Sequence, residues 1–297
     1  MFRLLFVALL IFGAENLSAA IYKYKDSSGK WVFSDKKPSS KIESESVKYK
    51  SAKKKVDRPK MFTGQEQGYN TLVVNNPLHA PIELEIESTL FGSPRHKQVI
   101  PALTSVVLHK SSGKIPEYRY RWVLGDPNKT TDSYRYLVPV VSGQKYRITQ
   151  SFNGRFSHSQ PPSIYAVDIA MQVGTYIGAA RGGTVIWVKD DYHMGGRDQF
   201  FLDKANLVMV LHEDGTYAVY AHILQGTALV KVGDKVKEGD KLARSGSSGY
   251  STGPHLHFVI RRNDDFKTRS VPFVFADGKG GTFTPRRGMK VPGGKVN

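Results

Sequence analysis

Polar and apolar residues alternate along much of the chain, with β-branched and aromatic side chains at many of the apolar positions. Clear examples are Ile82-Glu-Leu-Glu-Ile-Glu87 and Tyr118-Arg-Tyr-Arg-Trp-Val-Leu124. Side chains of a β-strand point alternately to opposite faces, so the pattern predicts strands with one buried and one solvated face. Residues 146–275 are also rich in strand patterns and show no convincing helical periodicity. We therefore expect a mainly β protein.

Turn-forming and polar stretches divide this pattern into segments. Two aromatic-rich runs flank Asp26-Ser-Ser-Gly29, which predicts a short hairpin module. A Ser/Lys/Glu-rich stretch follows, and a strand-rich region with turn residues at short intervals predicts a β-sandwich. A second strand-rich region precedes a tail rich in Gly, Pro, Lys and Arg. The expected order is a hairpin module (21–37), a basic flexible linker (38–60), a β-sandwich leader domain (61–143), a second β-domain (144–275) and a flexible tail (276–297).

The first twenty residues have the features of a cleavable signal peptide. A short positive start at Met1-Phe2-Arg3 precedes an apolar run from Leu4 to Phe12, and small residues follow in Leu17-Ser-Ala-Ala20. The apolar run is well short of the about 20 residues that span a bilayer. We expect residues 1–20 to be removed and the product to be periplasmic or extracellular, with no stable membrane anchor.

Charge and cysteine usage narrow the function classes. The formal net charge is +17, and residues 21–60 hold a large share of the excess, mainly in the linker. A nucleic-acid binder would carry its basic surface on a folded domain, so we expect no nucleic-acid partner. The linker charge suits anionic wall polymers or solubility alone. The chain has no cysteine, so any metal must be held by histidine and carboxylate side chains.

A histidine pair and one carboxylate suggest a metal site. On a strand, His255 and His257 point to the same face about 7 Å apart, although such pairs also occur as plain surface features. Asp168 lies inside the apolar run Tyr165-Ala-Val-Asp168-Ile-Ala-Met171. A buried carboxylate is costly unless a cation or a set of hydrogen bonds meets it. A zinc ion would meet that requirement.

Several motif blocks of the second β-domain carry a further signal. The blocks are His158, Tyr165-Ala-Val-Asp168, Gly174-Thr-Tyr-Ile-Gly-Ala-Ala-Arg-Gly-Gly-Thr-Val185, Asp214-Gly-Thr-Tyr-Ala-Val-Tyr-Ala-His222, Val232-Gly-Asp-Lys-Val-Lys-Glu-Gly239 and Ser245-Gly-Ser-Ser-Gly-Tyr-Ser-Thr-Gly-Pro-His-Leu-His257-Phe. In this order they resemble the catalytic domain of LytM- or lysostaphin-like zinc endopeptidases. The preceding region, including Leu124-Gly-Asp-Pro127, looks like the β-rich domain that precedes the peptidase in a periplasmic branch of that family.

The resemblance implies an antiparallel β-sheet domain with an open groove that holds one zinc ion. His158, Asp168 and His257 look like its ligands, which leaves a fourth position for water. His222 and His255 look like a second pair that orients and deprotonates this water and steadies the developing oxyanion. One departure from the lysostaphin-type motif is that nine residues, not three, separate His158 from Asp168, so the insert is expected to loop out.

The activity implied by the resemblance is an exported zinc endopeptidase that cuts peptide cross-links of peptidoglycan. The expected bond is the D-alanyl to diaminopimelate bridge, with a glycine-containing bridge left open. An alternative is a non-catalytic LytM-like adaptor that binds the wall or activates an amidase. The leader domain is expected either to occlude the groove or to bind glycan. Three further residues receive structural interpretations: His193 and His212 as surface histidines, and Asn206 as a turn former.

Overall fold

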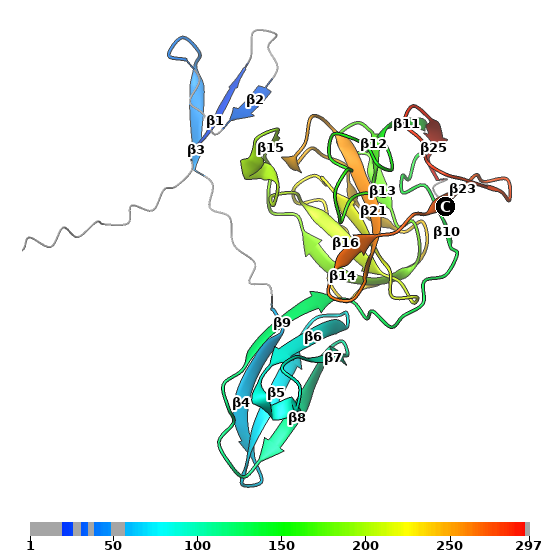
Figure 1. The fold of residues 1–297 in the computed structure, drawn as a ribbon. Helices are drawn as coiled ribbons and strands as arrows, with labels where there is room; N and C mark the ends of the chain where they lie inside the picture. Colours follow the sequence, from blue (N-terminus) through cyan, green and yellow to red (C-terminus); the bar gives the residue numbers. More distant parts are fainter. Residues whose placement is uncertain (1–19, 26–30, 35–38, 49–56, 295–297) are drawn as a thin grey trace, which may run out of the picture. The chain divides into compact units, whose positions relative to one another are not determined.

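The computed structural model describes residues 20–25, 31–34, 39–48 and 57–294 (Figure 1). Two compact units are present, Met1–Ala52 and Lys53–Asn297. The signal peptide falls outside the described residues apart from Ala20, as do the tip of the predicted hairpin and the run Lys53-Lys54-Lys55. No helix in the described part of the chain is long and apolar enough to cross a membrane.

The first unit contains an antiparallel sheet of three strands in the order β2-β1-β3. Pairing of β1 (Ala20–Lys25) with β2 (Trp31–Ser34) matches the expected hairpin. The third strand, β3 (Ser44–Lys48), lies in the segment expected to be a flexible linker, and this corrects that expectation. A two-stranded hairpin leaves backbone groups unpaired at its edges, and pairing of β3 with β1 satisfies one edge whatever the side chains.

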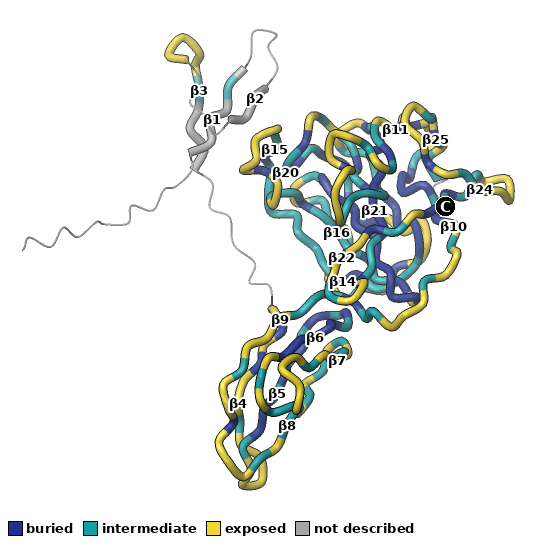
Figure 2. Tube along the Cα trace, viewed as in Figure 1, coloured by how far each residue is buried: buried dark blue, intermediate teal, exposed yellow. Residues whose placement is uncertain are grey.

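Six strands of the second unit form the expected β-sandwich leader. Two three-stranded sheets contribute the buried side chains of one shared apolar core, among them Leu72 and Val74 from one sheet and Ile82, Leu84 and Ile86 from the other. Figure 2 shows buried stretches of chain, in dark blue, along β5 and β6. The first sheet is β4 (Lys60–Glu66), β5 (Tyr69–Asn76) and β8 (Thr104–Ser111), and the second is β7 (His96–Ile100), β6 (Ile82–Glu87) and β9 (Arg119–Leu124), with a 3-10 turn η1 (Thr89–Phe91).

The rest of the unit is built on a nine-stranded antiparallel sheet with strand order β18-β14-β16-β17-β21-β12-β11-β25, to which β22 adds beside β21 (Figure 1). Its strands are β11 (Lys145–Gln150), β12 (Val167–Ala170), β14 (Gly183–Lys189), β16 (Leu207–Leu211), β17 (Tyr217–Ala221), β18 (Lys235–Val236), β21 (His255–Asn263), β22 (Thr268–Ser270) and β25 (Lys290–Pro292). The expected mainly β fold class, with its antiparallel sheet, is confirmed.

Short strands complete the domain at the margins of this sheet. A 3-10 turn, η2 (Gln199–Phe201), and η1 are the helical segments of the described residues. The short strands are β10 (Arg135–Tyr136), β13 (Tyr176–Gly178), β15 (Gly195–Gly196), β19 (Lys241–Arg244), β20 (Gly249–Tyr250), β23 (Val274–Ala276) and β24 (Thr282–Phe283).

Alternation along the central strands gives the sheet one face that packs in the apolar core and one face that carries polar side chains. In β21, Leu256 and Phe258 are fully buried in the main apolar core, which also takes Ile169 of β12. The intervening residues therefore point to the other face, and these include His257 and Asp168. The apolar positions of the strand pattern thus build the core, while the polar positions between them place the predicted site residues on the opposite face of the sheet.

Two boundaries expected from the sequence differ in the structure. Residues after β9 return to the second domain, where β10 pairs with β23 and Tyr136, Val138 and Val140 are buried in its core. The leader sandwich therefore ends before residue 143. Alternation shows that a strand buries one face, but it carries no information about which domain covers that face.

The expected flexible tail is also corrected for residues 276–294. Here β24 pairs with β23, and β25 pairs with β11 at the edge of the large sheet. Val291 is only 1% exposed, and Phe283 and Met289 pack against the core. Backbone hydrogen bonds to an open sheet edge need little side-chain periodicity, which explains why the composition concealed this strand.

His212 is a further correction, because it is not on the surface. It is 3% exposed, and its Nδ1 lies 3.0 Å from the Gly182 carbonyl oxygen. Burial lowers the pKa of His212 to about 4. His193 is half-buried rather than exposed.

The leader and the second domain contact each other at the far end of β21. The Glu83 carboxylate of the leader accepts hydrogen bonds from Asn263 Nδ2 at 2.7 Å and from the Phe266 amide at 2.8 Å. The Arg121 guanidinium lies 4.7 Å from the centre of the Phe266 ring. These contacts lie several residues along β21 from His255 and His257, which begin the strand.

Candidate metal centre and groove

A groove of about 520 Å³ lies over the face of the sheet that carries Asp168 and His257. Residues of β16, β17, β21, β12 and β11 line its floor, and Phe156 and Tyr250 stand at its side with their rings stacked 5.9 Å apart. All its lining residues come from Thr149 onward, so the described leader residues do not line it.

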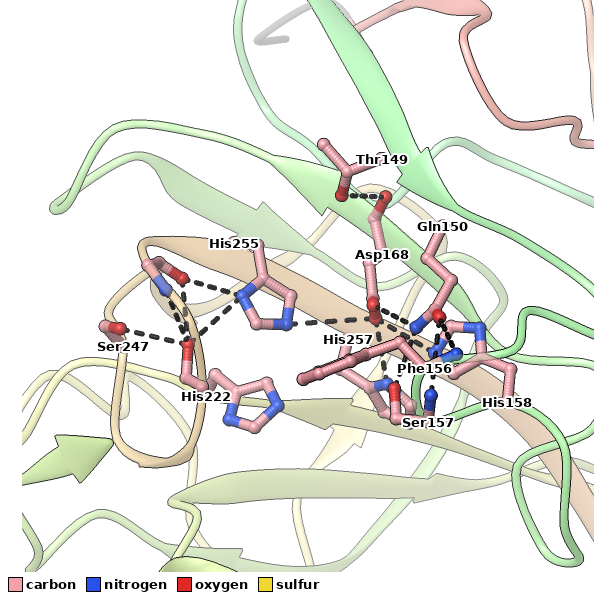
Figure 3. Close-up of polar contacts among 12 residues, drawn as sticks. Thr149, Gln150, Phe156, Ser157, His158, Asp168, His222, Ser247, His255 and His257 are labelled. Carbon is pink, nitrogen blue, oxygen red and sulfur yellow. Dashed lines mark hydrogen bonds and ion pairs between the residues drawn. The ribbon is translucent and has the colours of Figure 1, made fainter. Parts of the chain in front are cut away.

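Three predicted ligands lie close together at this groove, and two of them, Asp168 and His257, line it (Figure 3). Asp168 of β12 and His257 of β21 are directly paired residues on neighbouring strands, and their Oδ1 and Nδ1 atoms lie 2.9 Å apart. His158 comes from the loop after β11, and its Nε2 lies 3.2 Å from the same Asp168 oxygen. Sheet register therefore places two members of the set, and a loop brings the third.

The loop conformation fixes the direction of the His158 ring. The side chain is fully buried, and its Nδ1 lies 3.0 Å from the Ser151 carbonyl oxygen. A carbonyl only accepts, so Nδ1 donates and a neutral ring presents the Nε2 lone pair toward the Asp168 carboxylate. Two lone pairs repel at this distance unless a proton or a cation lies between them. The nine-residue spacing to Asp168 allows this placement because Ser159, Gln160 and Pro161 of the insert loop outward and are exposed.

The donor set fits a zinc ion. One ligand atom from each of His158, Asp168 and His257 lies within 4.8 Å of the others. Zinc takes imidazole nitrogen and carboxylate oxygen at about 2.0–2.2 Å, so donors around one ion lie about 4 Å apart or less. Nε2 of His158 is buried and has no hydrogen-bond partner within the described residues, which leaves its lone pair for a cation.

The charge of Asp168 is secured by its neighbours. Burial acts to raise its pKa, but a proton or cation held at His158 Nε2, together with the His257 imidazole, outweighs that effect and holds the pKa of this carboxyl well below its usual range. Gln150 adds a hydrogen bond from Nε2 to Asp168 Oδ2 at 2.9 Å. The carboxylate is therefore ionised and held in place at neutral pH.

Gln150 was not singled out in the sequence, although it links the loop to the ligands. Its Oε1 accepts hydrogen bonds from the amides of Phe156 and Ser157, while its Nε2 reaches Asp168 (Figure 3). The same side chain thus orients the segment that leads to His158. A glutamine at the end of an alternating strand gives no sequence signal for this role.

His222 and His255 form a second group beside the ligands. Their ring centres are 4.6 Å apart, and His255 Nε2 lies 3.8 Å from Asp168 Oδ1. The Nδ1 atom of His222 lies 2.6 Å from the Ser248 carbonyl oxygen, and that of His255 lies 2.8 Å from the Gly253 carbonyl oxygen. Both rings therefore donate from Nδ1, which leaves each Nε2 as a proton acceptor when the ring is neutral.

The backbone of His222 is strained, and its ring is neutral. A φ of 66° puts a non-glycine residue in the left-handed region, at a cost of about 1–3 kcal/mol. The Gly246 amide donates to its carbonyl oxygen at 3.0 Å and helps to hold this conformation. Burial, with His255 and His257 nearby, lowers the pKa of His222 to about 3. The imidazole is uncharged at neutral pH.

Asn206 supports this second group from behind and is more than a turn former. It is fully buried, its Oδ1 accepts from the Tyr192 amide at 3.0 Å, and its carbonyl oxygen accepts from the Ile223 amide at 3.3 Å. Its own amide donates to Ser248 Oγ at 3.1 Å. The residue that follows His222 and the loop that holds its ring are thus joined through one asparagine.

Comparison with known proteins identifies the domain that carries this groove. Residues 163–268 match the model of peptidase family M23. This part of the chain is an M23 peptidase domain. The M23 domain holds Asp168, His222, His255 and His257 within the matched range, while His158 lies just before it. The expected resemblance to LytM/lysostaphin-like peptidases is confirmed for this domain.

Relatives of the M23 domain differ in their names and organisms. An uncharacterized metalloprotease of Buchnera aphidicola is 35% identical over 39% of this chain and 29% of its own length. The peptidoglycan DD-endopeptidase ShyA of Vibrio cholerae is 30% identical over 41% of this chain and 26% of its own. The chain thus spans less than a third of either relative. The solved catalytic domain of the antimicrobial peptidase lysostaphin from Staphylococcus simulans is 28% identical, covering 39% of this chain and 78% of that one, with a TM-score of 0.27.

Proposed function

We propose that the chain is an exported zinc metalloendopeptidase that hydrolyses peptide cross-links of peptidoglycan. The observation that carries the proposal is the convergence of five side chains, four of which line one open groove while His158 is buried beside it. His158, Asp168 and His257 surround one point, and His222 and His255 present their Nε2 atoms beside it. The M23 family match and the endopeptidase relative support a peptidase.

Zinc would be held by His158, Asp168 and His257. A bound zinc ion supplies Lewis acidity, which lowers the pKa of water to about 7 and polarises a carbonyl. Asp168 brings one negative charge to the site, and the two imidazoles bring none. The similarity to a named metalloprotease supports the metal.

His222 and His255 would handle protons during hydrolysis. Each ring is held through Nδ1 by a backbone carbonyl, so Nε2 is the atom that accepts a proton from water. A protonated ring then donates to the leaving nitrogen or to a developing oxyanion. The domain therefore needs no glutamate base of the HExxH type.

The groove suits an extended peptide as substrate. Its floor crosses several strands, and an aromatic pair stands at one side, so a strand-like chain has continuous surface to contact. Likeness to a peptidoglycan DD-endopeptidase supports a cross-linked wall peptide and favours the D-alanyl to diaminopimelate bond. Export through the N-terminal signal would bring the enzyme to this substrate.

The test combines metal analysis with digestion of purified sacculi. We expect about one zinc per mature chain and release of muropeptides that stops with a chelator and returns with zinc. Mass analysis of the products identifies the bond. His109→Ala in β8 of the leader removes a histidine remote from the groove and serves as the control, with unchanged zinc and cleavage.

The outcomes separate the proposal from the adaptor alternative. Full zinc occupancy without cleavage, before and after deletion of the leader, would refute the peptidase and favour the adaptor. Absence of zinc from a folded chain supplied with zinc would refute the metal assignment.

A further inference from the structure

A second pocket, of about 1020 Å³, adjoins the groove and is lined by four arginines. The two cavities share Thr149, Phe156, Asp168 and Thr252. The four side chains come from three separate segments of the chain and are all exposed. We call this cavity the arginine pocket, and its arginines are Arg155, Arg197, Arg286 and Arg287.

The positive charge of the arginine pocket is not neutralised by the described residues. None of its four guanidinium groups lies within 4 Å of a carboxylate in that part of the chain, unlike Arg121 or Arg181, which do form ion pairs. Asp168 is the one acidic side chain in the lining, and His158 and His257 already engage it. An anionic ligand would therefore meet four cations and little competition.

The segment that carries two of these arginines is anchored to the sheet. Ser151 Oγ donates to the Pro285 carbonyl oxygen at 2.8 Å, and the Gly288 amide donates to the Ile148 carbonyl oxygen at 2.8 Å. These two bonds lie on either side of Arg286 and Arg287. The backbone of the arginine pair is thus fixed against β11, although the side chains themselves are exposed.

Strand order gives the distance from the catalytic centre. Asp168 lies on β12, β11 is its neighbour, and the arginine segment leads into β25 beyond β11. Neighbouring strands are about 4.8 Å apart, which puts this segment about 10 Å from β12. An extended peptide advances about 3.3 Å per residue, so a substrate crossing the strands would reach the pocket about three residues from the reacting bond.

We propose that the arginine pocket is a subsite for a free carboxylate of the substrate, so that the enzyme selects acidic peptides. The inference rests on the proposed function and adds the chemical class of substrate to it. Guanidinium groups bind carboxylates through two parallel hydrogen bonds, which gives both attraction and orientation. A peptide whose carboxylates are amidated would lose this contact.

The test uses soluble cross-linked muropeptides prepared with a muramidase, either native or with their carboxylates converted to amides. The variant is Arg286→Gln with Arg287→Gln, and the control is Lys145→Gln with Arg147→Gln, which removes two exposed charges of β11 outside both cavities. We expect the variant to lower kcat/KM for native muropeptides about tenfold, mainly through KM. The control should stay near wild type, and amidation should lower wild-type kcat/KM by a similar factor but affect the variant little.

Binding measured by calorimetry separates this inference from the proposed function. His222→Ala retains all four arginines and should bind native muropeptides about tenfold more tightly than amidated ones even if no cleavage is ever observed. Equal affinity for the two preparations, or equal losses in variant and control, would overturn the subsite. Competition by inorganic phosphate without discrimination between the preparations would identify a phosphate site and also overturn the proposal.

Discussion

The two halves of the groove use the same residue type in opposite ways. Around Asp168, two imidazoles turn toward a carboxylate, and the cluster carries a negative charge that suits a cation. Around His222 and His255, each Nδ1 is bound to a backbone carbonyl, so neither ring depends on a carboxylate for its orientation. Histidine alone does not define a ligand. The Nδ1 of His158 is also held by a backbone carbonyl, so that partner does not separate the two groups. What differs is the distance from Nε2 to Asp168 Oδ1, which is 3.2 Å for His158 and 3.8 Å for His255.

The largest effect is expected at the carboxylate. Asp168→Asn removes the negative charge while keeping the shape, so zinc should be lost and cleavage should fall at least about 10³-fold. Metal analysis and muropeptide release measure the two effects. Asp203→Asn, at an exposed site outside the groove, should change neither. Retention of zinc by Asp168→Asn would show that the group around Asp168 does not need its negative charge to bind the metal, and would contradict the contrast with His222 and His255.

Truncation of His222 should separate metal binding from turnover. His222→Ala deletes a proton acceptor and no ligand, so we expect full zinc content and a loss of cleavage of about 10²–10⁴-fold. Zinc content and kcat are measured on the same preparation. Loss of zinc by this variant would make His222 a metal ligand and contradict its assignment as a proton acceptor.

A Gln150 variant tests whether the predicted zinc ligands depend on the hydrogen bonds that Gln150 makes around them. Gln150→Ala removes a hydrogen bond to Asp168 and three bonds that hold the loop before His158. We expect zinc affinity to fall about tenfold with the fold retained, which competition with a chelator would show. Gln144→Ala, at an exposed position before β11, is the matched control. Equal affinity in both variants would show that the ligands need no such support.

The smallest effect is expected from mild acid. A pKa of His222 lowered to about 3 means that its neutral form persists as pH falls through 6.5, where an ordinary histidine would become charged. At saturating zinc we therefore expect kcat to change less than about twofold between pH 7 and 5. A fall centred near pH 6.5 with zinc still bound would show that His222 titrates normally or does not act as the base.

Local pattern predicted many of the strands and drew attention to Asp168, His255 and His257, while the family resemblance supplied the full candidate site. Alternation in β6, β9 and β21 requires one buried face, and an isolated Asp168 in an apolar run requires a partner. The five site residues were found through motif blocks, and the structure brings them together. Their individual chemical roles stay predictions.

What the sequence did not reveal depends on partners distant along the chain. Val138 and Val140 look alike whether the leader or the M23 domain covers them, and β25 is held by the open edge of β11. His212 is buried because distant segments pack over it, and Gln150 acts through a loop whose path no local pattern specifies. Such contacts are properties of the assembled domain, and no window of neighbouring residues contains them.

Pairing of β11 with β25 has a consequence for the order in which the domain is built. The first and last strands of the large sheet are neighbours, so this edge closes only after nearly all of the domain has been synthesised. Strands β12 and β21, which hold Asp168 and His257, are complete before Arg286 and Arg287 emerge. During synthesis Asp168 and His257 are therefore made before the arginine pocket is complete. The arginines of the proposed carboxylate subsite are the last of these residues to be added to the growing chain.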